Sequence, residues 1–385
     1  MKYLKKYKFK FKCMTPIHIG SGEKISIFDY KVRERQIKAG TPRGEFDYFL
    51  CVFDHAKIYH SLNEMDKQKF ISLSKSDRPQ DITSLREMIA EHAKENEHYY
   101  YKTLAHKAFY EHYENKKGAL NNQCGLNLFA RNGFIPYIPG SSIKGAIRTG
   151  IMNSLFNACD GVKTADIKNN ARGNGRYAEF SIMNALSHKG YPDIEKDPFG
   201  GLLVSDISLA NGDIYACKLL KYRYSEKNKI IDVLSNQKNQ SGMELNFELA
   251  KTQDKTLEII VNSKKFNIGH DILTLLEHCD KFSKRVLIDE CERLFKHNDS
   301  IARDTPFKPS EIAEAYQNIK SGSAGEGKFL LRVGFSGGYD ATTIKKIRNF
   351  PEPKPGKMGM GWGYSKNLFK KYPLGFVLLE FESEE

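Results

Sequence analysis

The sequence lacks long apolar runs, paired cysteines and any obvious targeting segment. No window approaches the roughly 18 consecutive apolar residues of a membrane-spanning helix, and the lysine-rich N-terminus has no apolar segment typical of signal peptides. The seven cysteines include no Cys-x-x-Cys pair, which predicts buried reduced thiols and not disulfides or a zinc site. These absences predict a soluble cytoplasmic protein with no membrane partner, no metal and no other cofactor.

Motifs of several hydrolase classes are also missing. Residues 322–329, GSAGEGKF, place Gly322, Gly327 and Lys328 as in a phosphate-binding P-loop, but Phe329 stands where the magnesium-binding serine or threonine belongs. A strand pattern follows where that motif needs a helix, so we exclude ATP hydrolysis. The chain also has no Gly-x-Ser-x-Gly, His-Glu-x-x-His or EF-hand sequence.

Positive charge is what the chain has in excess. Its 385 residues include 60 lysines and arginines against 47 aspartates and glutamates, so the formal net charge is +13. A basic chain favours polyanionic partners, with nucleic acid first among them. The hydrophobic content of 40% is sufficient for a real core, so we expect folded domains.

Alternating and helical patterns divide the chain into strand-rich and helix-rich parts. Residues 6–13 alternate lysine with apolar side chains, which predicts a half-buried strand with an exposed face of lysines. Residues 54–132 are charged, with apolar positions at helical spacing, which predicts a mostly helical insertion; residues 270–298 form the longest helical pattern. We predict an α+β fold, with a first domain over 1–264 that contains the insertion and a C-terminal helical and β region over 265–385.

One predicted helix begins with an unusual charge pattern. In FIPYIPGSSIKGAIRTGI, residues 134–151, a Pro-Gly pair ends an apolar segment and a helix starts at about Ser142. Helix N-termini carry partial positive charge, so Lys144 and Arg148, which share one face, are unfavourable there unless an anion is present. Because Ser141 or Ser142 can cap the first amides, we predict an anion site formed by Ser141, Ser142, Lys144 and Arg148.

Two glycine-containing segments are further candidates for contact with phosphate or ribose. The first, TPIHIGSGEK, follows the lysine strand and is predicted to be a turn. The second, RVGFSGGYD, combines closely spaced glycines with aromatic residues, so its amides can approach a phosphate and its rings can stack on a base. The candidate residues of the second segment are Arg332, Gly334, Gly337, Gly338 and Tyr339.

His18 and Glu23 are the weak catalytic candidates of the first segment. A histidine in a glycine turn after a basic strand can act as a general acid or base in metal-independent RNA cleavage, and Glu23 can assist as an acid. The alternative is that His18 packs or hydrogen-bonds in the turn and that Glu23 is solvated beside Lys24. The sequence favours this structural interpretation, because it identifies no lysine or tyrosine partner for His18.

Taken together and in this order, TPIHIGSGEK, IPYIPGSSIKGAIRTGI and LRVGFSGGY resemble the RAMP superfamily of CRISPR RNA-binding proteins. Within it, DPFGGLLVSDI and the terminal PLGFVLLEFE are most similar to the fifth-subunit family of the type III-A Csm effector complex. The resemblance implies a ferredoxin-like or RRM-like core with an antiparallel sheet. It leaves open whether residues 265–385 form a second ferredoxin-like unit or complete the first.

The same resemblance implies a non-catalytic subunit that binds the guide RNA (crRNA). It implies a position at the 3′-end side of the complex, a contribution to crRNA maturation and antiviral defence, and contacts with other Csm subunits, especially the repeated backbone subunit, and with host nucleases. Gly20, Ser21 and Gly22 would line an RNA-facing turn, and Glu23 follows where relatives that cut target RNA carry an aspartate.

Two alternatives remain open at this point. One is a metal-independent or acid-assisted endoribonuclease that uses His18 and Glu23 to process crRNA precursors, and the other is a protein scaffold. For the RNA-binding hypothesis, charge reversal at Lys144 or Arg148 is expected to weaken binding with little change in the thermal unfolding midpoint.

Overall fold

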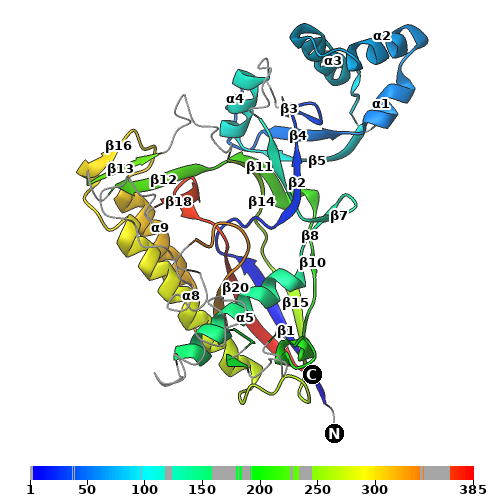
Figure 1. The fold of residues 1–385 in the computed structure, drawn as a ribbon. Helices are drawn as coiled ribbons and strands as arrows, with labels where there is room; N and C mark the ends of the chain where they lie inside the picture. The colour runs from blue at the N-terminus through cyan, green and yellow to red at the C-terminus, as the bar shows by residue number, and fades with distance from the viewer. Residues whose placement is uncertain are drawn as a thin grey trace.

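The α+β class predicted from the sequence is confirmed by the structure (Figure 1). The structure is a computed structural model that describes residues 3–36, 38, 40–95, 97–117, 124–157, 179–180, 182–183, 191, 193–225, 229–233, 245–338, 341 and 365–385. The strands are β1 (Leu4–Cys13), β2 (Gly20–Ile25), β3 (Tyr30–Glu34), β4 (Tyr48–Phe53), β5 (Tyr99–Ala105), β6 (Leu126–Phe129), β7 (Arg131–Asn132), β8 (Ile135–Ile138), β9 (Leu202–Val204), β10 (Ile207–Ser208), β11 (Ile214–Lys218), β12 (Leu220–Ser225), β13 (Ile230–Val233), β14 (Asn246–Ala250), β15 (Lys255–Asn262), β16 (Ala302–Arg303), β17 (Lys328–Arg332), β18 (Ser365–Phe369), β19 (Tyr372–Pro373) and β20 (Phe376–Glu384). The helices are α1 (His55–Ser61), α2 (Glu64–Ser74), α3 (Pro79–His92), α4 (Lys107–Lys116), α5 (Gly140–Asn157), α8 (Ile272–Leu294) and α9 (Pro309–Gly322), with short 3-10 turns η1 (Pro198–Gly201), η2 (Asn211–Asp213) and η3 (Asp299–Ile301).

Strand β1 is the centre of a sheet with the order β17-β20-β1-β15-β9. It pairs antiparallel with both β15 and β20, and its side chains at alternate positions, Tyr7, Phe9, Phe11 and Cys13, are buried. The predicted half-buried strand is therefore confirmed, because an alternating pattern places every second residue on the core face.

Three lysines on the lysine face of β1 pair with acidic residues in or next to the neighbouring strands. Lys6 forms an ion pair with Glu258 of β15 at 2.6 Å, and Lys10 pairs with Asp254 at 2.8 Å. Lys5 pairs with Glu384 at 2.7 Å, and Lys8 pairs with Glu385. Lys6, Lys8 and Lys10 are therefore paired with carboxylates of the same chain and are not free cations.

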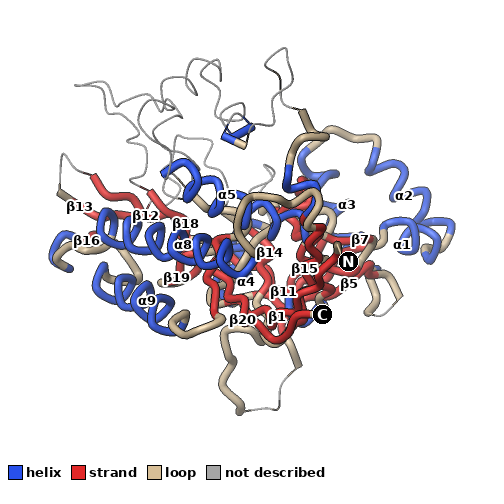
Figure 2. Tube along the Cα trace, turned by 90° about the horizontal axis from the view of Figure 1, so that it is seen from below, coloured by secondary structure: helices blue, strands red, loops and turns tan. Residues whose placement is uncertain are grey.

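The C-terminal strands complete the sheet that β1 begins. Strands β17 and β20 lie beyond residue 265, yet both belong to the sheet of β1. Figure 2 shows the two termini side by side, where β1 and β20 pair. The predicted boundary between residues 264 and 265 therefore does not coincide with a boundary between sheets.

Helices α5 and α8 pack against each other over one face of this sheet (Figure 1). Close packing depends on Gly150, because an added Cβ there would lie 2.7 Å from the Cα and Sγ atoms of Cys279 in α8. By contrast, Gly145 in the same helix is exposed, and no atom lies within 4 Å of its added Cβ. Two glycines of one helix thus have opposite environments.

This contrast predicts opposite effects of alanine at the two positions. Gly150→Ala is expected to lower the free energy of unfolding by about 1–3 kcal/mol, because the backbone of α8 must move. Gly145→Ala is expected to raise it by about 0.5–1 kcal/mol through helix propensity. Denaturant unfolding of the two variants tests this, and equal effects would contradict the packing described for Gly150.

A second, mixed sheet has the order β2-β6-β14-β11-β5-β4-β3. Strand β5 pairs antiparallel with β4 and parallel with β11. The predicted mostly helical insertion over 54–132 therefore contains helices α1–α4, but residues 99–105, 126–129 and 131–132 of it are strands. In residues 99–105, Tyr101, Thr103 and Ala105 are buried and Lys102 and Leu104 between them are half-buried, as in a strand, although the spacing also fits a helical stripe.

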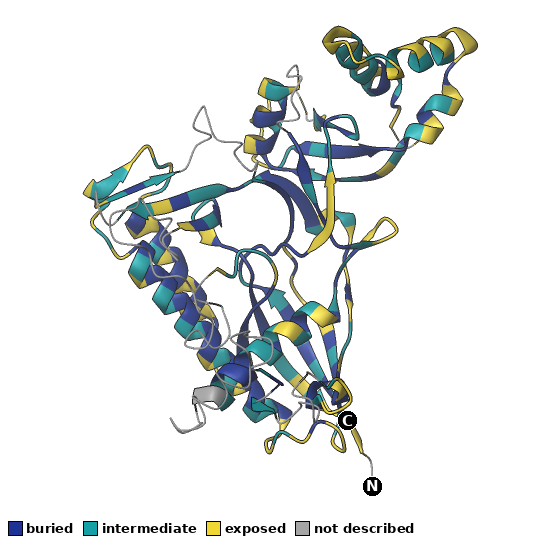
Figure 3. Ribbon diagram, in the orientation of Figure 1, coloured by how far each residue is buried: buried dark blue, intermediate teal, exposed yellow. Residues whose placement is uncertain are grey.

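Helices α1–α3 form the first part of that insertion and project away from the sheets, whereas α4 follows β5 (Figure 1). Asp54 and Asn63 cap the N-termini of α1 and α2 through their side chains. The three helices pack around a small apolar cluster that contains Ile58 and Ile89, and most of their outer surface is exposed (Figure 3).

Candidate nucleic-acid interface

The start of α5 is fixed by the segment between β9 and β10. An added Cβ at Gly140 would lie 2.1 Å from the carbonyl oxygen of Val204, so only glycine fits there. The Gly140 N–H donates to the Asp206 carboxylate at 2.7 Å. The sequence predicted that Ser141 or Ser142 caps the helix, whereas the structure supplies a carboxylate from a distant segment. Asp206 also provides negative charge at the helix N-terminus that the local sequence omits.

Arg148 lies in a partly buried cluster that connects α5 to the segment before β9. Its guanidinium pairs with Asp197 at 2.7 Å and with Glu179 at 3.5 Å. The same group lies over the rings of Phe180 and Phe199, at 5.3 Å and 4.8 Å from the centroids. The structure thus gives Arg148 a stabilising role that the sequence did not predict.

Lys144 shares this face of α5 but is placed differently. Burial, together with the positive charges of Arg148 and Lys265, lowers the pKa of Lys144, and the Asp197 carboxylate opposes this effect. The Lys265 side chain packs against Gly200, because a Cβ added to Gly200 would lie 2.6 Å from the Lys265 Nζ. Ser141 is exposed and Ser142 is half-buried at the same helix end. Lys144 is therefore the candidate of this motif whose charge is best available to an external anion.

The glycine-containing part of the first segment, residues 20–24, belongs to the exposed strand β2, so the turn predicted there is not formed (Figure 3). Gly20, Ser21, Gly22 and Glu23 are all exposed in β2, which lies at one end of the mixed sheet. The pairing of β2 with β6 shifts between Gly20 and Lys24, and Gly22 has a φ of +87°. A bulge that needs glycine in the left-handed region explains why the sequence pattern looks like a turn.

His18 is buried, and its surroundings favour the structural interpretation of this residue. Its Nδ1 lies 2.7 Å from the carbonyl oxygen of Glu248. The imidazole packs edge-on against the rings of Phe129, Phe247 and Phe335. Burial lowers the pKa of His18, so the ring is neutral at physiological pH. Glu23 is exposed, and its N–H donates to the Ser21 hydroxyl at 3.1 Å.

The second glycine segment contacts the first directly. The Phe335 N–H donates to the carbonyl oxygen of His18 at 2.8 Å. Gly334 has a φ of +78°, and an added Cβ would lie 2.3 Å from the same oxygen. The side chains of Ile19, Ile143 and Val333 belong to one hydrophobic cluster, so α5 packs into the same core as both glycine segments. The structure therefore brings together three segments that lie far apart in the sequence.

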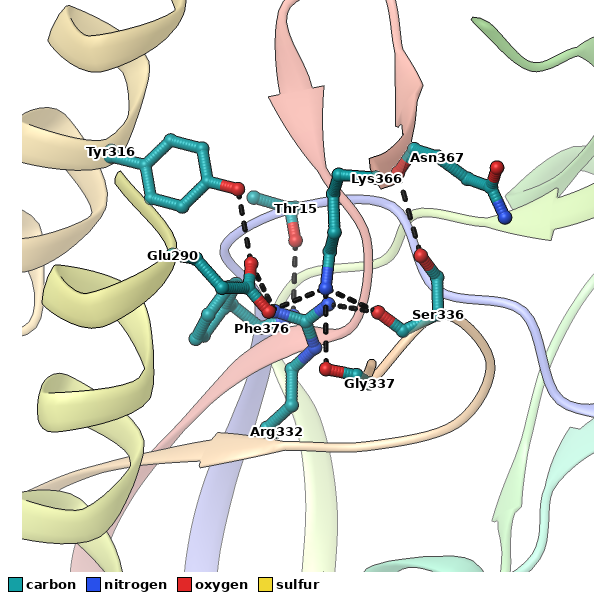
Figure 4. A network of polar contacts seen from close by, with 9 residues as sticks. All are labelled: Thr15, Glu290, Tyr316, Arg332, Ser336, Gly337, Lys366, Asn367 and Phe376. Atoms are coloured by element: carbon teal, nitrogen blue, oxygen red, sulfur yellow. Dashed lines mark hydrogen bonds and ion pairs between the residues drawn. The ribbon is translucent and has the colours of Figure 1, made fainter. Parts of the chain in front are cut away.

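A buried polar network lies beneath the second glycine segment (Figure 4). Glu290 of α8 pairs with Lys366 of β18 and lies 3.6 Å from the Arg332 guanidinium of β17. Tyr316 of α9 donates to Glu290 at 3.0 Å. Only 3% of the Arg332 side chain is exposed, so the structure does not leave this predicted contact residue available to RNA. Gly334 and Gly338 are exposed and Gly337 is half-buried, while the candidate Tyr339 lies outside the described residues.

In the described ranges, we find no cluster of three or more histidine, cysteine, aspartate or glutamate residues suited to a metal. No helix within the same ranges has the length and apolarity needed to cross a bilayer. Six of the seven cysteines are described, and all six are buried free thiols, as predicted.

Several residues that organise this region could not be identified from the sequence: Asp197, Asp206, Glu248, Lys265, Glu290 and Lys366. One signal was present for Glu290, because it falls on the apolar stripe of α8 beside Leu287 and Leu294. A charged residue at a buried helical position needs a partner. The sequence does not identify that partner.

The chain is similar to proteins of the RAMP superfamily and to a Csm5 protein. The family model of the RAMP superfamily matches residues 10–309. A Methanocaldococcus jannaschii protein named CRISPR system Cms protein Csm5 is 26% identical over 345 residues, which cover 87% of this chain and 72% of that protein.

Two solved structures share the fold. A chain of a cryo-EM structure, a Csm-crRNA-target RNA ternary complex of a type III-A CRISPR-Cas system, aligns with a TM-score of 0.62 at 18% identity and covers 98% of this chain and 100% of that one. The crystal structure of T. onnurineus Csm5 aligns with a TM-score of 0.58 at 16% identity and covers 96% of this chain and 99% of that one.

Proposed function

The chain belongs to the RAMP superfamily, and from this premise we propose that it is a non-catalytic guide-RNA-binding subunit of a type III-A Csm effector complex. The similarity to M. jannaschii Csm5 and the fold shared with a chain of a Csm-crRNA-target RNA complex support this assignment. The proposed partners are the crRNA, the other Csm subunits, especially the repeated backbone subunit, and host nucleases. We place the subunit at the 3′-end side of the guide, where it contributes to crRNA maturation and antiviral defence in the cytoplasm.

The observation that carries the proposal is the meeting of the three motif segments. The first and third touch through the hydrogen bond from Phe335 to His18, and α5 shares their core. Around them, the exposed glycines Gly20, Gly22, Gly334 and Gly338 permit close approach of a phosphate backbone. Lys144 supplies positive charge on α5, beside Arg148 and Lys265.

A non-catalytic role is supported by the environment of His18. A general acid or base must reach the proton that it transfers, whereas this imidazole is enclosed by three aromatic rings and bonded to a backbone carbonyl. Glu23 keeps an exposed carboxylate in β2. Of the two residues proposed for the endoribonuclease alternative, Glu23 is accessible and His18 is not.

Charge reversal at Lys144 tests RNA binding. Lys144→Glu is expected to weaken binding of a labelled single-stranded RNA about tenfold at moderate salt, because a phosphate contact becomes a repulsion. Lys144→Gln is expected to reduce the slope of log affinity against log salt by about 0.7. Fluorescence anisotropy over a salt series measures both quantities, with Lys69→Glu on the exposed surface of α2 as the matched control.

Three outcomes of this assay separate the hypotheses. Equal affinities for wild type, Lys144→Glu and Lys69→Glu would remove Lys144 from the interface. A wild-type chain that neither binds RNA nor co-purifies with Csm subunits would refute the proposed function. Cleavage of precursor RNA, insensitive to EDTA and lost in His18→Ala, would support the ribonuclease alternative.

A further inference from the structure

Two buried cations hold the carbonyl groups of the second glycine segment. The Ser336 carbonyl oxygen accepts from Arg332 at 2.7 Å and from Lys366 Nζ at 2.5 Å. Lys366 Nζ also donates to the Gly337 carbonyl oxygen at 3.2 Å (Figure 4). Only 4% of the Lys366 side chain is exposed, so these bonds form beneath the loop and not on its surface.

The direction of these carbonyls fixes the direction of an amide. In a trans peptide the C=O and the following N–H point in opposite directions. Because the Ser336 carbonyl points toward the buried cations, the Gly337 N–H points away from them. Gly337 is half-buried and Gly338 is exposed, so the loop itself lies at the surface.

The loop conformation requires such support. Ser336 has a φ of +68°, although it is not glycine, and it lies between Gly334 at +78° and Gly338 at +70°. Backbone in the left-handed region is unfavourable for a residue with a Cβ and persists where surrounding contacts determine it. Glu290 supplies those contacts indirectly, because it pairs with Lys366 and lies beside Arg332.

We propose that Glu290, Lys366 and Arg332 are positioning residues that orient the 334–338 loop so that the Gly337 N–H binds a phosphate of the guide RNA. This inference rests on the proposed RNA-binding function and adds to it three residues that do not touch the RNA. Backbone amides recognise phosphate independently of base identity. The resulting contact therefore fits a subunit that holds RNA of any sequence.

Two measurements on the full chain test this inference with a single-stranded RNA as the probe. The first is the Gly337 amide proton resonance in a ¹⁵N-glycine-labelled sample, which is expected to move downfield when RNA is added. The second is RNA affinity, which is expected to fall about tenfold in Lys366→Met and to recover in Lys366→Arg. Tyr316→Phe is the matched control, because it removes a bond to Glu290 on the side away from the loop and leaves both cations in place.

The outcomes distinguish this inference from the function on which it rests. A Gly337 resonance that stays unchanged while wild type binds RNA would overturn the positioning role and leave the proposed function intact. Equal losses of affinity in Lys366→Met and Tyr316→Phe would also overturn it, because a general loss of stability would explain both. If Lys366→Met does not fold, the Gly337 shift in wild type and Lys366→Arg decides the question. Absence of RNA binding by wild type refutes both proposals.

Discussion

Replacing Glu290 with alanine is expected to lower the free energy of unfolding by about 3–5 kcal/mol. Glu290 is fully buried, and its carboxylate is shared by Lys366, Arg332 and Tyr316. Removing it leaves two cations in a region of low dielectric without their carboxylate, and the desolvation cost of these charges is no longer offset. The network joins α8, α9, β17 and β18, so the loss affects the whole C-terminal part of the chain.

Glu292 provides a matched control for this substitution, two residues away on the same helix. Its pair with Lys296 is exposed, with 56% and 72% of the two side chains accessible. Exposed ion pairs contribute little, so Glu292→Ala is expected to change the free energy of unfolding by less than about 1 kcal/mol. Denaturant unfolding measures both variants. Similar effects of Glu290→Ala and Glu292→Ala would contradict the buried network.

A double variant separates the charge from the shape of the network. Replacing Glu290 with leucine and Lys366 with methionine removes a charge of each sign. It is expected to be less destabilising than the sum of the single substitutions, because a buried ion pair replaced by apolar groups of similar size leaves less uncompensated charge. Additive effects would show that the two residues do not interact energetically.

Elements whose pattern is local were predicted correctly from the sequence. The alternation in β1 and the helical stripe of α8 each depend on residues a few positions apart, and the structure confirms both. Strand β5 shows the limit of this reasoning. Its YYYKTLA sequence fits a helical stripe as well as a strand, and pairing with β4 and β11 decides the outcome. Tertiary contacts thus override an ambiguous local pattern.

Long-range partners were the main information that the sequence did not provide. The motif around α5 predicted an anion at the helix start, but the structure places Asp206 there, 66 residues along the chain. The contact between the two glycine segments, a hydrogen bond from the Phe335 N–H to the His18 carbonyl oxygen, is likewise a long-range one. The sequence predicted that Arg148 contacts RNA because it does not reveal the carboxylate partners of this arginine. Asp197 and Glu179 lie in another segment, at no recognisable spacing from Arg148.

Arg148→Glu is expected to destabilise the protein by about 3 kcal/mol, which corrects the expectation from sequence that the unfolding midpoint stays unchanged. The guanidinium pairs with Asp197 and Glu179, and its own side chain is only 19% exposed. Reversal places a third carboxylate against these two and removes the cation from the rings of Phe180 and Phe199. For a chain of this size, such a loss lowers the midpoint by on the order of 5 °C.

Lys144→Glu is the matched control, because it makes the same charge change four residues earlier on the same helix. It is expected to leave the free energy of unfolding within about 1 kcal/mol of wild type. An unchanged midpoint in Arg148→Glu would contradict the stabilising role of the cluster.

Asp197→Asn then separates a stabilising role of Arg148 from direct RNA contact. This variant removes one negative charge beside Arg148 without changing the arginine itself. If Arg148 binds phosphate, the greater local positive charge should raise RNA affinity and steepen its salt dependence. Because the structure assigns Arg148 to the fold, we expect Asp197→Asn to lower stability while its salt slope stays that of wild type. If Asp197→Asn behaves in this way, a loss of RNA binding in Arg148→Glu has an indirect cause. The substitution then disturbs the start of α5, which also carries Lys144, and does not remove a direct phosphate contact.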